Sequence, residues 1–390
     1  MKSFPSMGTR ALAVALATAL FAACASGTES SGGAPGVLAP VHVDLSAPLP
    51  KNLSAFNFFH WDRTTGFTFN EAVVPYELNV QLFSDHALKQ RAVYVPPGMA
   101  GQFQPDDAFD FPVGTVFIKN FYFPADFRAP TQNLRLIETR LLIHYETGWQ
   151  GWPYIWDAEQ KDAVLSPAGE VTPISFIDPE GLPETANYLV PQHNQCVNCH
   201  AAPQGDSPLP PVVLLGAKAR YLNRDYDYGG TVGSKNQLTH LADLGQLQGL
   251  PPLDSFYTAY DLHPYLVDGV DNVAPADVPR AARDYLDINC AHCHKPNAIQ
   301  GATSQLFLNH DNTDVFHLGV CKRPGSAGAG TGGLTYDIVS GNPDQSILYF
   351  RINTEDVGAM MPLIGRSITD KRGVALVRQW IQTLGLPPCQ

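Results

Sequence analysis

The sequence of 390 residues contains few charges and no long apolar segment. Its N-terminal apolar run, Ala11–Ala23, has thirteen residues and is too short for a transmembrane helix. Only 16% of the residues are charged, and the formal net charge of −12 argues against binding to nucleic acid or to anionic lipid. The sequence also has no phosphate-binding loop, nucleic-acid motif or long internal repeat. What remains is the composition of a globular protein of two or three domains.

Cysteine is scarce as well, because the chain has only seven. Four of them stand in two pentapeptides, CVNCH at 196–200 and CAHCH at 290–294. C-x-x-C-H is the attachment sequence of c-type haem, in which two thiols bind the porphyrin covalently and the histidine ligates the iron. A four-cysteine zinc site or two disulfides are the alternatives, and both leave the two histidines unexplained. We therefore predict two covalent haems, attached at Cys196, Cys199, Cys290 and Cys293, with His200 and His294 as the proximal iron ligands.

The N-terminus has the pattern of a bacterial export signal. A basic start and the apolar run lead to Ala22–Ala23–Cys24, which resembles a lipobox with a cysteine that carries the lipid. We predict a signal peptide over residues 1–23, lipidation of Cys24 and a flexible tether over residues 24–44, which are rich in Gly, Ser and Pro. Cleavage to a soluble secreted protein is the alternative. The expected location is the periplasmic side of the cell envelope, at the outer membrane, with the lipid as the sole membrane contact.

Two cysteines remain once the haem and lipid sites are assigned. Cys321 and Cys389 are the one pair left for a disulfide in an oxidising compartment. The alternative is a free buried thiol at Cys321, with Cys389 unpaired near the chain end. We predict the disulfide.

Three regions follow from the local patterns. Residues 45–190 hold short aromatic and β-branched runs, such as Thr115–Phe123 and Leu136–Tyr145, which predict a β-rich, sandwich-like domain. Residues 191–277 form the first haem segment, which is irregular apart from a helix expected over Asn236–Leu247. Residues 278–390 predict a small all-α cytochrome c domain, because one helix leads into the second pentapeptide and another closes the chain.

The helices of the last region have recognisable starts. Asp277 and Pro279 have the residue types of an N-cap and a first turn, and Thr369 or Asp370 occupies the same place before the final helix. The apolar stripe of that final helix comprises Val374, Val377, Trp380, Ile381 and Leu384.

The distal iron ligands follow from an inventory of methionines and histidines. Met361 precedes a proline between the second pentapeptide and the last helix, so we predict that its thioether ligates the second haem, with Met360 as the alternative. No methionine lies between His200 and Cys290. For the first haem we predict His240, which lies on the expected helix; the alternatives are His263, His193, Met99 or water.

Several stretches of the chain resemble a family of bacterial dihaem c-type cytochromes, often lipoproteins, with an N-terminal β-rich region and no assigned physiological role. The resemblance covers most of residues 50–385. It implies electron transfer, with His200 and His294 as proximal ligands and Met361 at the matching Met-Pro position. The similar stretches are VVPYELNVQLFSDHALKQR, FPVGTVFIKNFYFP, LIETRLLIHYETGW, NYLVPQHNQCVNCH, LGAKARYLNRDYDY, NQLTHLADLG, GNPDQSILYFRI and MMPLIGRSI.

Two classes of function are consistent with these patterns. We favour an electron carrier that passes single electrons between another cytochrome and a dehydrogenase or oxidase, and an acidic surface suits docking to a basic patch on such a partner. The alternative is a dihaem enzyme of the cytochrome c peroxidase type, with an open or displaceable site at the first haem. The ligand of the first haem separates the two. A purely structural metal or disulfide module is a third class, which would show no haem absorption.

Overall fold

The computed structural model describes residues 38–201, 211–268, 272–296, 298 and 304–390. Residues 38–390 form one compact unit by their contacts. The signal peptide and lipidation site expected at 1–23 and Cys24 lie outside the described residues, as does most of the expected tether. No helix in the described part of the chain is long and apolar enough to cross a membrane.

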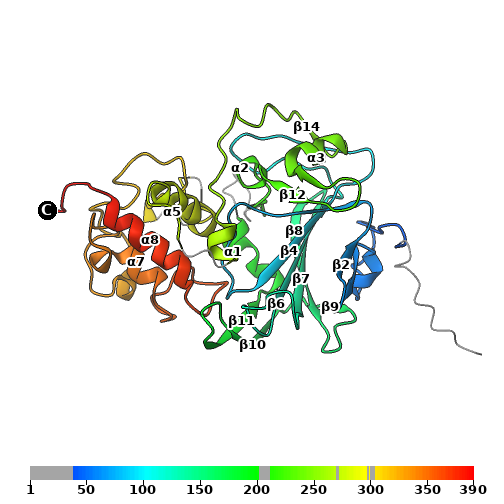
Figure 1. The fold of residues 1–390 in the computed structure, drawn as a ribbon, viewed down its shortest axis with the longest axis horizontal. Coiled ribbons are helices and arrows are strands. Elements are labelled where there is room, and N and C mark those ends of the chain that lie inside the picture. The colour runs from blue at the N-terminus through cyan, green and yellow to red at the C-terminus, as the bar shows by residue number, and fades with distance from the viewer. Residues whose placement is uncertain (1–37, 202–210, 269–271, 297, 299–303) are drawn as a thin grey trace, which may run out of the picture. The chain divides into compact units, whose positions relative to one another are not determined.

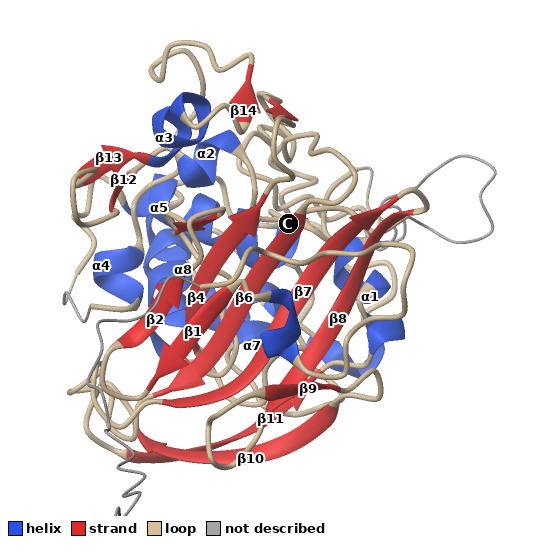
Figure 2. Cartoon of the chain, turned by 90° about the vertical axis from the view of Figure 1, so that its right-hand side faces the viewer, coloured by secondary structure: helices blue, strands red, loops and turns tan. Residues whose placement is uncertain are grey.

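The N-terminal half is β-rich, as the sequence predicts, and is built around one six-stranded antiparallel sheet (Figures 1 and 2). The strands follow the order β3–β4–β6–β7–β8–β9, and β4, β6, β7 and β8 are its long central members. The bounds are β3 (Val73–Tyr76), β4 (Leu88–Tyr94), β6 (Val116–Phe123), β7 (Arg135–Tyr145), β8 (Gly148–Trp156) and β9 (Ala163–Leu165).

Both faces of this sheet are covered, which explains why its strands are apolar runs with little alternation. On the outer face, Ile118 and Leu141 are fully buried under the chain's N-terminal segment. That segment includes η1 (Leu53–Phe56) and the hairpin of β1 (Phe59–Asp62) with β2 (Gly66–Phe69). The face between the sheet and the C-terminal half is called the inner face below.

The expected sandwich is present only in part. A two-stranded ribbon, β10 (Glu170–Ile177) with β11 (Pro183–Val190), covers one end of the inner face, where Phe121 and Phe123 pack against it. The rest of the inner face is covered by the C-terminal half, because Val93 and Phe117 share a core with helical residues. A second sheet of comparable size is therefore not needed to bury this face.

The section that follows β11 is irregular, as expected. It carries η2 (His193–Gln195), α1 (Val197–His200), α2 (Ala219–Leu222), α3 (Gln237–Asp243) and α4 (His263–Leu266). It also carries three short strands: β12 (Asp225–Asp227) pairs with β13 (Ser234–Asn236), and β14 (Leu247–Gln248) pairs in parallel with β5 (Gly101–Gln102). This last pairing ties the section to the β-rich half.

The helix expected over Asn236–Leu247 is shorter than predicted. Asn236 is its N-cap, since the side-chain oxygen accepts hydrogen bonds from the backbone N–H groups of Leu238 and Thr239. The helix ends at Asp243, because Gly245 adopts a positive φ of 71°. Leu244 is consequently 50% exposed and does not continue the apolar face.

The last section is helical (Figure 1). It contains α5 (Val278–Leu286), which runs on into the π-turn η3 (Asp287–Ala291), followed by η4 (Gly328–Thr331), η5 (Pro343–Gln345), α7 (Ile347–Ile352) and α8 (Lys371–Thr383). Asp370 caps α8 through a hydrogen bond from the N–H of Gly373, whereas Asp277 precedes α5 without a side-chain cap bond. The turn η3 carries Cys290, so α5 delivers the second pentapeptide as predicted.

Helices α5 and α8 pack closely, and a glycine makes this possible. A Cβ atom on Gly373 would lie 2.2 Å from the ring of Tyr285. The hydroxyl of Tyr285 also donates a hydrogen bond to Asp370, at 2.9 Å, so the two helices are joined by a buried polar contact.

The β-rich half and the last section are joined by Asp85, whose side chain is almost fully buried. Its carboxylate accepts hydrogen bonds from the N–H groups of Ser367 and Ile368, at 2.6 and 3.1 Å, and from the hydroxyl of Ser367. Lys371 adds an ion pair with Asp178, at 2.8 Å. These contacts fix the loop before α8 against the sheet.

Replacing Gly373 by alanine should lower the free energy of unfolding by about 1–3 kcal/mol, because the added methyl group overlaps the Tyr285 ring. Gly358→Ala is the matched control, since its added Cβ meets only the Asp356 side chain, at 3.4 Å. Chemical denaturation of both variants measures the difference. Equal stabilities would show that α5 and α8 do not approach so closely.

Candidate functional site

A cavity lies between the inner face of the sheet and the first pentapeptide. Cys196, Cys199 and His200 line one side of it. Residues of the central strands, of the loop after the pentapeptide and of the loop before α8 form the rest of the wall. The sheet contributes Arg91, Phe117, Lys119, Arg140, Leu142 and Gly151; the loops contribute Leu214, Leu215, Gly216, Ala217, Pro362, Ile364 and Gly365.

His200 is oriented by a backbone contact. Its Nδ1 lies 2.7 Å from the carbonyl oxygen of Val213, so Nδ1 carries the proton and donates it there. Burial lowers the pKa of His200 to about 4, against an opposing effect of the Val213 hydrogen bond, so the ring is neutral at pH 7. Its Nε2 then keeps a free lone pair, which is the arrangement that metal-ligating histidines have.

The two pentapeptides lie side by side. The thiol of Cys293 is 3.5 Å from the carbonyl oxygen of Asn198, although the two residues are 95 positions apart in the sequence. The four cysteines of the pentapeptides are unpaired. Their proximity was not foreseen from the sequence, because nothing in either motif encodes a contact with the other.

These thiols do not have the properties of catalytic nucleophiles. Burial raises the pKa of both Cys290 and Cys293 to about 12, and it also raises the pKa of Cys196 and Cys199. Reactive cysteines have lowered pKa values. Among the described residues, no group of three or more His, Cys, Asp or Glu side chains converges to hold a metal ion, so the geometry does not favour the four-cysteine zinc alternative.

The second pentapeptide has a less strongly oriented histidine. The Nδ1 of His294 lies 3.3 Å from the hydroxyl of Ser304. Burial lowers the pKa of His294 to about 4, and the positive charge of Arg351 acts in the same direction. His294 is therefore also neutral at pH 7.

The methionine loop borders the cavity of the first pentapeptide. Met360 is buried, with 8% of its surface exposed, and Met361 is half-buried. Pro362 and Ile364, directly after Met361, line that cavity. The assignment of Met361 as a ligand of the second haem stays a prediction.

His240, the predicted distal ligand of the first haem, is not among the residues that line the cavity. Its ring packs against that of Tyr228 at a centroid distance of 3.9 Å. The helix α3 packs with β13 and β14. The assignment of His240 stays a prediction.

The three side-chain alternatives to His240 differ in how close they lie to the cavity. His193 stacks on Trp152, at 3.9 Å between ring centroids, and its Nδ1 contacts the carbonyl of Gly151. His263 is in ion-pair range of Asp268, and Met99 is 47% exposed. None of the three lines the cavity.

The cations and the additional histidine that line the cavity of the first pentapeptide were not identified from the sequence. Arg91, Lys119 and Arg140 come from three adjacent strands, and no motif marks them. His292 stands inside the second pentapeptide, yet it lines the first cavity, where burial and, to a lesser degree, the charge of His200 lower its pKa. The available signal was an alternation of basic and apolar residues in each strand, but this pattern is equally typical of a strand with one solvent-exposed face.

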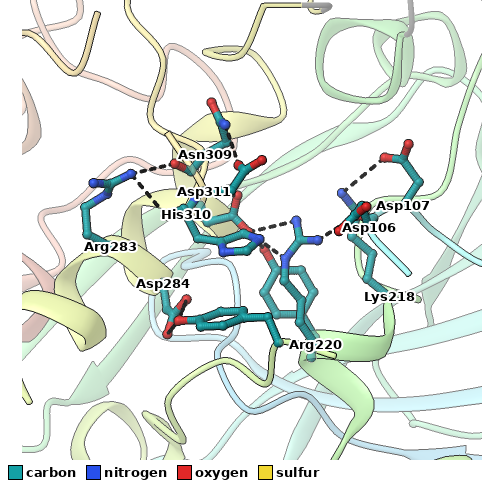
Figure 3. Close-up of polar contacts among 12 residues, drawn as sticks. Asp106, Asp107, Lys218, Arg220, Arg283, Asp284, Asn309, His310 and Asp311 are labelled. Atoms are coloured by element: carbon teal, nitrogen blue, oxygen red, sulfur yellow. Dashed lines mark hydrogen bonds and ion pairs between the residues drawn. The ribbon is translucent and has the colours of Figure 1, made fainter. Parts of the chain in front are cut away.

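A second, more polar cavity shares Leu214, Leu215, Ile288 and His292 with the first. Figure 3 shows its polar contacts. Arg220 forms an ion pair with Asp287, at 2.9 Å, and donates a hydrogen bond to the carbonyl of Asp106. The hydroxyl of Tyr221 also donates to Asp287.

The same region holds α5 in place. Arg283 donates hydrogen bonds to the carbonyl oxygens of Asn309, His310 and Asn312 (Figure 3). Asp284 accepts hydrogen bonds from the hydroxyl of Tyr257 and the N–H of Tyr260. The carboxylates of Asp284 and Asp287 are paired within the protein, as in a structural network, whereas the buried Nε of Arg283 has no hydrogen-bond partner in the described structure.

A disulfide joins Cys321 and Cys389, with a Cα–Cα distance of 5.1 Å. This is the pairing that the cysteine inventory predicts. It connects the chain end to the loop that follows the second pentapeptide.

Replacing Asp284 by asparagine should change how stability depends on pH. Burial raises the pKa of Asp284 to about 6, above the value of about 3.9 in an unfolded chain. Between pH 4 and pH 6 the carboxyl of Asp284 therefore stays protonated in the folded state but ionises in the unfolded chain. The free energy of unfolding of the wild type consequently falls as pH rises through that window. The free energy of unfolding of Asp284→Asn, relative to that of the wild type, should rise by about 2–3 kcal/mol between pH 4 and pH 7. Denaturation curves at several pH values measure this, and a constant difference between the two proteins would contradict it.

Comparison of the chain with models of protein families, with curated proteins and with solved structures found no match. The family resemblance drawn from the sequence therefore remains an expectation. The functional argument below relies on the two pentapeptides and on the geometry around them.

Proposed function

We propose that the protein is a dihaem c-type cytochrome that transfers electrons in the bacterial cell envelope. The observation that carries the proposal is the contact between the two C-x-x-C-H pentapeptides, from the Cys293 thiol to the Asn198 carbonyl. Separate structural sites need not touch. Two redox groups that exchange electrons must be close, and groups attached to adjoining pentapeptides are held close by covalent bonds.

The residues around the first pentapeptide fit a covalent haem. Cys196 and Cys199 are unpaired thiols at the edge of a cavity, and His200 has a free Nε2 in the same cavity. The walls include the apolar side chains of Phe117, Leu142 and Leu214. When bound, the haem supplies an iron that accepts and releases one electron, and the protein's part is to attach it, ligate it and exclude water.

The second pentapeptide supports a centre of a different kind. Cys290 and Cys293 would attach its haem, with His294 as proximal ligand and the thioether of Met361 as distal ligand. A thioether stabilises ferrous iron and raises the reduction potential. Because the first cavity has no methionine among its lining residues, we propose that the two centres have unequal potentials and that the second is the higher.

Partners and location follow as further parts of the proposal. With residues 1–23 removed, Lys2 and Arg10 are lost and the formal charge changes from −12 to −14. Such a surface suits docking to a basic patch on another cytochrome, a dehydrogenase or an oxidase. The lipid on Cys24 would hold the protein at the outer membrane without a spanning segment.

The covalent haem content tests the proposal directly. The wild type, produced with a cytochrome c maturation system, should retain two haems after denaturation. Cys196→Ala/Cys199→Ala and Cys290→Ala/Cys293→Ala should each retain one, because each removes one pair of attachment thiols. Haem is quantified by absorbance and by intact mass. Cys321→Ala/Cys389→Ala is the matched control, since it also removes two cysteines and should retain both haems. A wild type without covalent haem would refute the proposal.

Met361→Ala should abolish the near-infrared band of thioether-ligated ferric haem and lower the reduction potential of one centre only, because ferrous iron loses its preferred ligand. Met360→Ala, one residue away, should keep both features. Spectra and a potentiometric titration record the result. The reverse pattern would transfer the ligand role to Met360.

A further inference from the structure

Three cations form a row across the inner face of the sheet. Arg91 on β4 lies opposite Lys119 on β6, and Lys119 lies opposite Arg140 on β7. Residues directly opposite on neighbouring strands project from the same face. All three side chains line the cavity that contains Cys196, Cys199 and His200.

This cation row is not neutralised by the protein. Arg140 has a partner, because it forms an ion pair with buried Glu138 at 2.5 Å. In the part of the chain that the structure describes, neither Arg91 nor Lys119 forms an ion pair. Arg91 has one hydrogen bond, to the side-chain oxygen of Gln81 at 3.3 Å. The ammonium group of Lys119 contacts the ring of Phe121, at 4.8 Å from the centroid.

Such an arrangement of unpaired cations raises the free energy of the folded protein. Like charges directly opposite each other on neighbouring strands destabilise a sheet. Burial also disfavours the charged forms, and it lowers the pKa of Arg91 and, well below the usual range, that of Lys119. A charge that is removed from water needs a counter-charge or strong hydrogen bonds.

Other buried cations of this protein have the partners that the row lacks. Lys322 forms an ion pair with Asp337 at 3.0 Å, and Arg220 forms one with Asp287 at 2.9 Å. Arg366 has no ion pair among the described residues, but it donates hydrogen bonds to the carbonyl oxygens of Met361, Ile368, Arg351 and Thr354. In the described structure Arg91 and Lys119 have neither a carboxylate nor such a set of carbonyl oxygens, and this points to a charge from outside the polypeptide.

The position of the row relates it to the first pentapeptide. The charges of Lys119 and Arg140 act on both Cys199 and His200. The row therefore begins beside the attachment and ligand residues and extends across the sheet to Arg91. A group attached to Cys196 and Cys199 lies in the same cavity as these cations.

We propose that the cation row is an anion-binding site at the first haem, which takes an oxygen-bearing anion such as a carboxylate or a small inorganic oxyanion. This inference rests on the proposed function, since it presumes a haem at Cys196 and Cys199. The anion has two possible sources: the propionates of that haem, or a free oxyanion bound beside its iron. Guanidinium and ammonium groups bind either through charge-assisted hydrogen bonds. An uncharged substrate such as hydrogen peroxide gains little from this row.

The test uses the full-length protein with its haem content verified first, so loss of haem is distinguished from loss of anion binding. Nitrite is the probe for a free oxyanion. Carbon monoxide is a neutral ligand whose binding should not depend on the cation row. Lys119→Gln removes the central charge. Lys89→Gln is the matched control, because Lys89 is on the next inward-facing position of β4 but donates to the carbonyl of Ala87 and does not line the cavity. Lys119→Arg keeps the charge.

If the anion is free, nitrite should perturb the Soret band of the wild type, and Lys119→Gln should weaken nitrite binding at least tenfold. Lys89→Gln and Lys119→Arg should stay close to wild type, and carbon monoxide binding should not change in any variant. If the anion is a propionate, nitrite should have no effect, and Lys119→Gln and Arg91→Gln should each shift the haem propionate bands in resonance Raman spectra while Lys89→Gln does not.

Misfolding would not mimic either result, because removing an unpaired, half-buried cation relieves a cost, so Lys119→Gln should unfold at or above the wild-type temperature. The proposal is overturned if Lys119→Gln and Arg91→Gln both leave nitrite affinity and the propionate bands as they are in Lys89→Gln, in protein that retains both haems.

Discussion

The central constraint is that both faces of the six-stranded sheet must be buried. The chain's N-terminal segment covers the outer face over Ile118 and Leu141. The β10–β11 ribbon covers only one end of the inner face, so the segments that follow it must cover the rest. The first pentapeptide begins six residues after β11 ends at Val190, and it is therefore held against the sheet. Burial of apolar strands thus decides where the candidate haem site lies.

Contacts between distant segments then bring the second pentapeptide to the first. Asp85, in the β-rich half, accepts hydrogen bonds from Ser367 and Ile368, so the loop before α8 is fixed against the sheet. The close approach of Gly373 to Tyr285 fixes α8 against α5, and α5 leads directly to Cys290. The sheet, the methionine loop and both pentapeptides consequently belong to one packed unit.

Buried charge distinguishes the structural parts of the molecule from its candidate functional part. Where charge serves the fold, as in Arg220 with Asp287, the partner belongs to the same chain and its hydrogen bonds are satisfied. In the first cavity, Arg91 and Lys119 have no such partner in the described structure. Because a desolvated charge raises the free energy of the folded state, this difference is the physical basis for the proposed binding surface, which lines the same cavity as His200.

The sequence by itself determined the local chemistry: the two C-x-x-C-H pentapeptides, the strands of the β-rich half, the start of α8 at Thr369 or Asp370 and the pairing of Cys321 with Cys389. These features depend on residue type and short spacing, which a sequence displays. It could not determine that α3 ends at Asp243 or that His240 packs against Tyr228, because a helix face has no direction until its neighbours are placed. Only the tertiary structure decided the contact between Cys293 and Asn198 and the alignment of Arg91, Lys119 and Arg140. Both arise from strand register and packing between segments far apart in the chain, and these are set by the burial of the whole sheet.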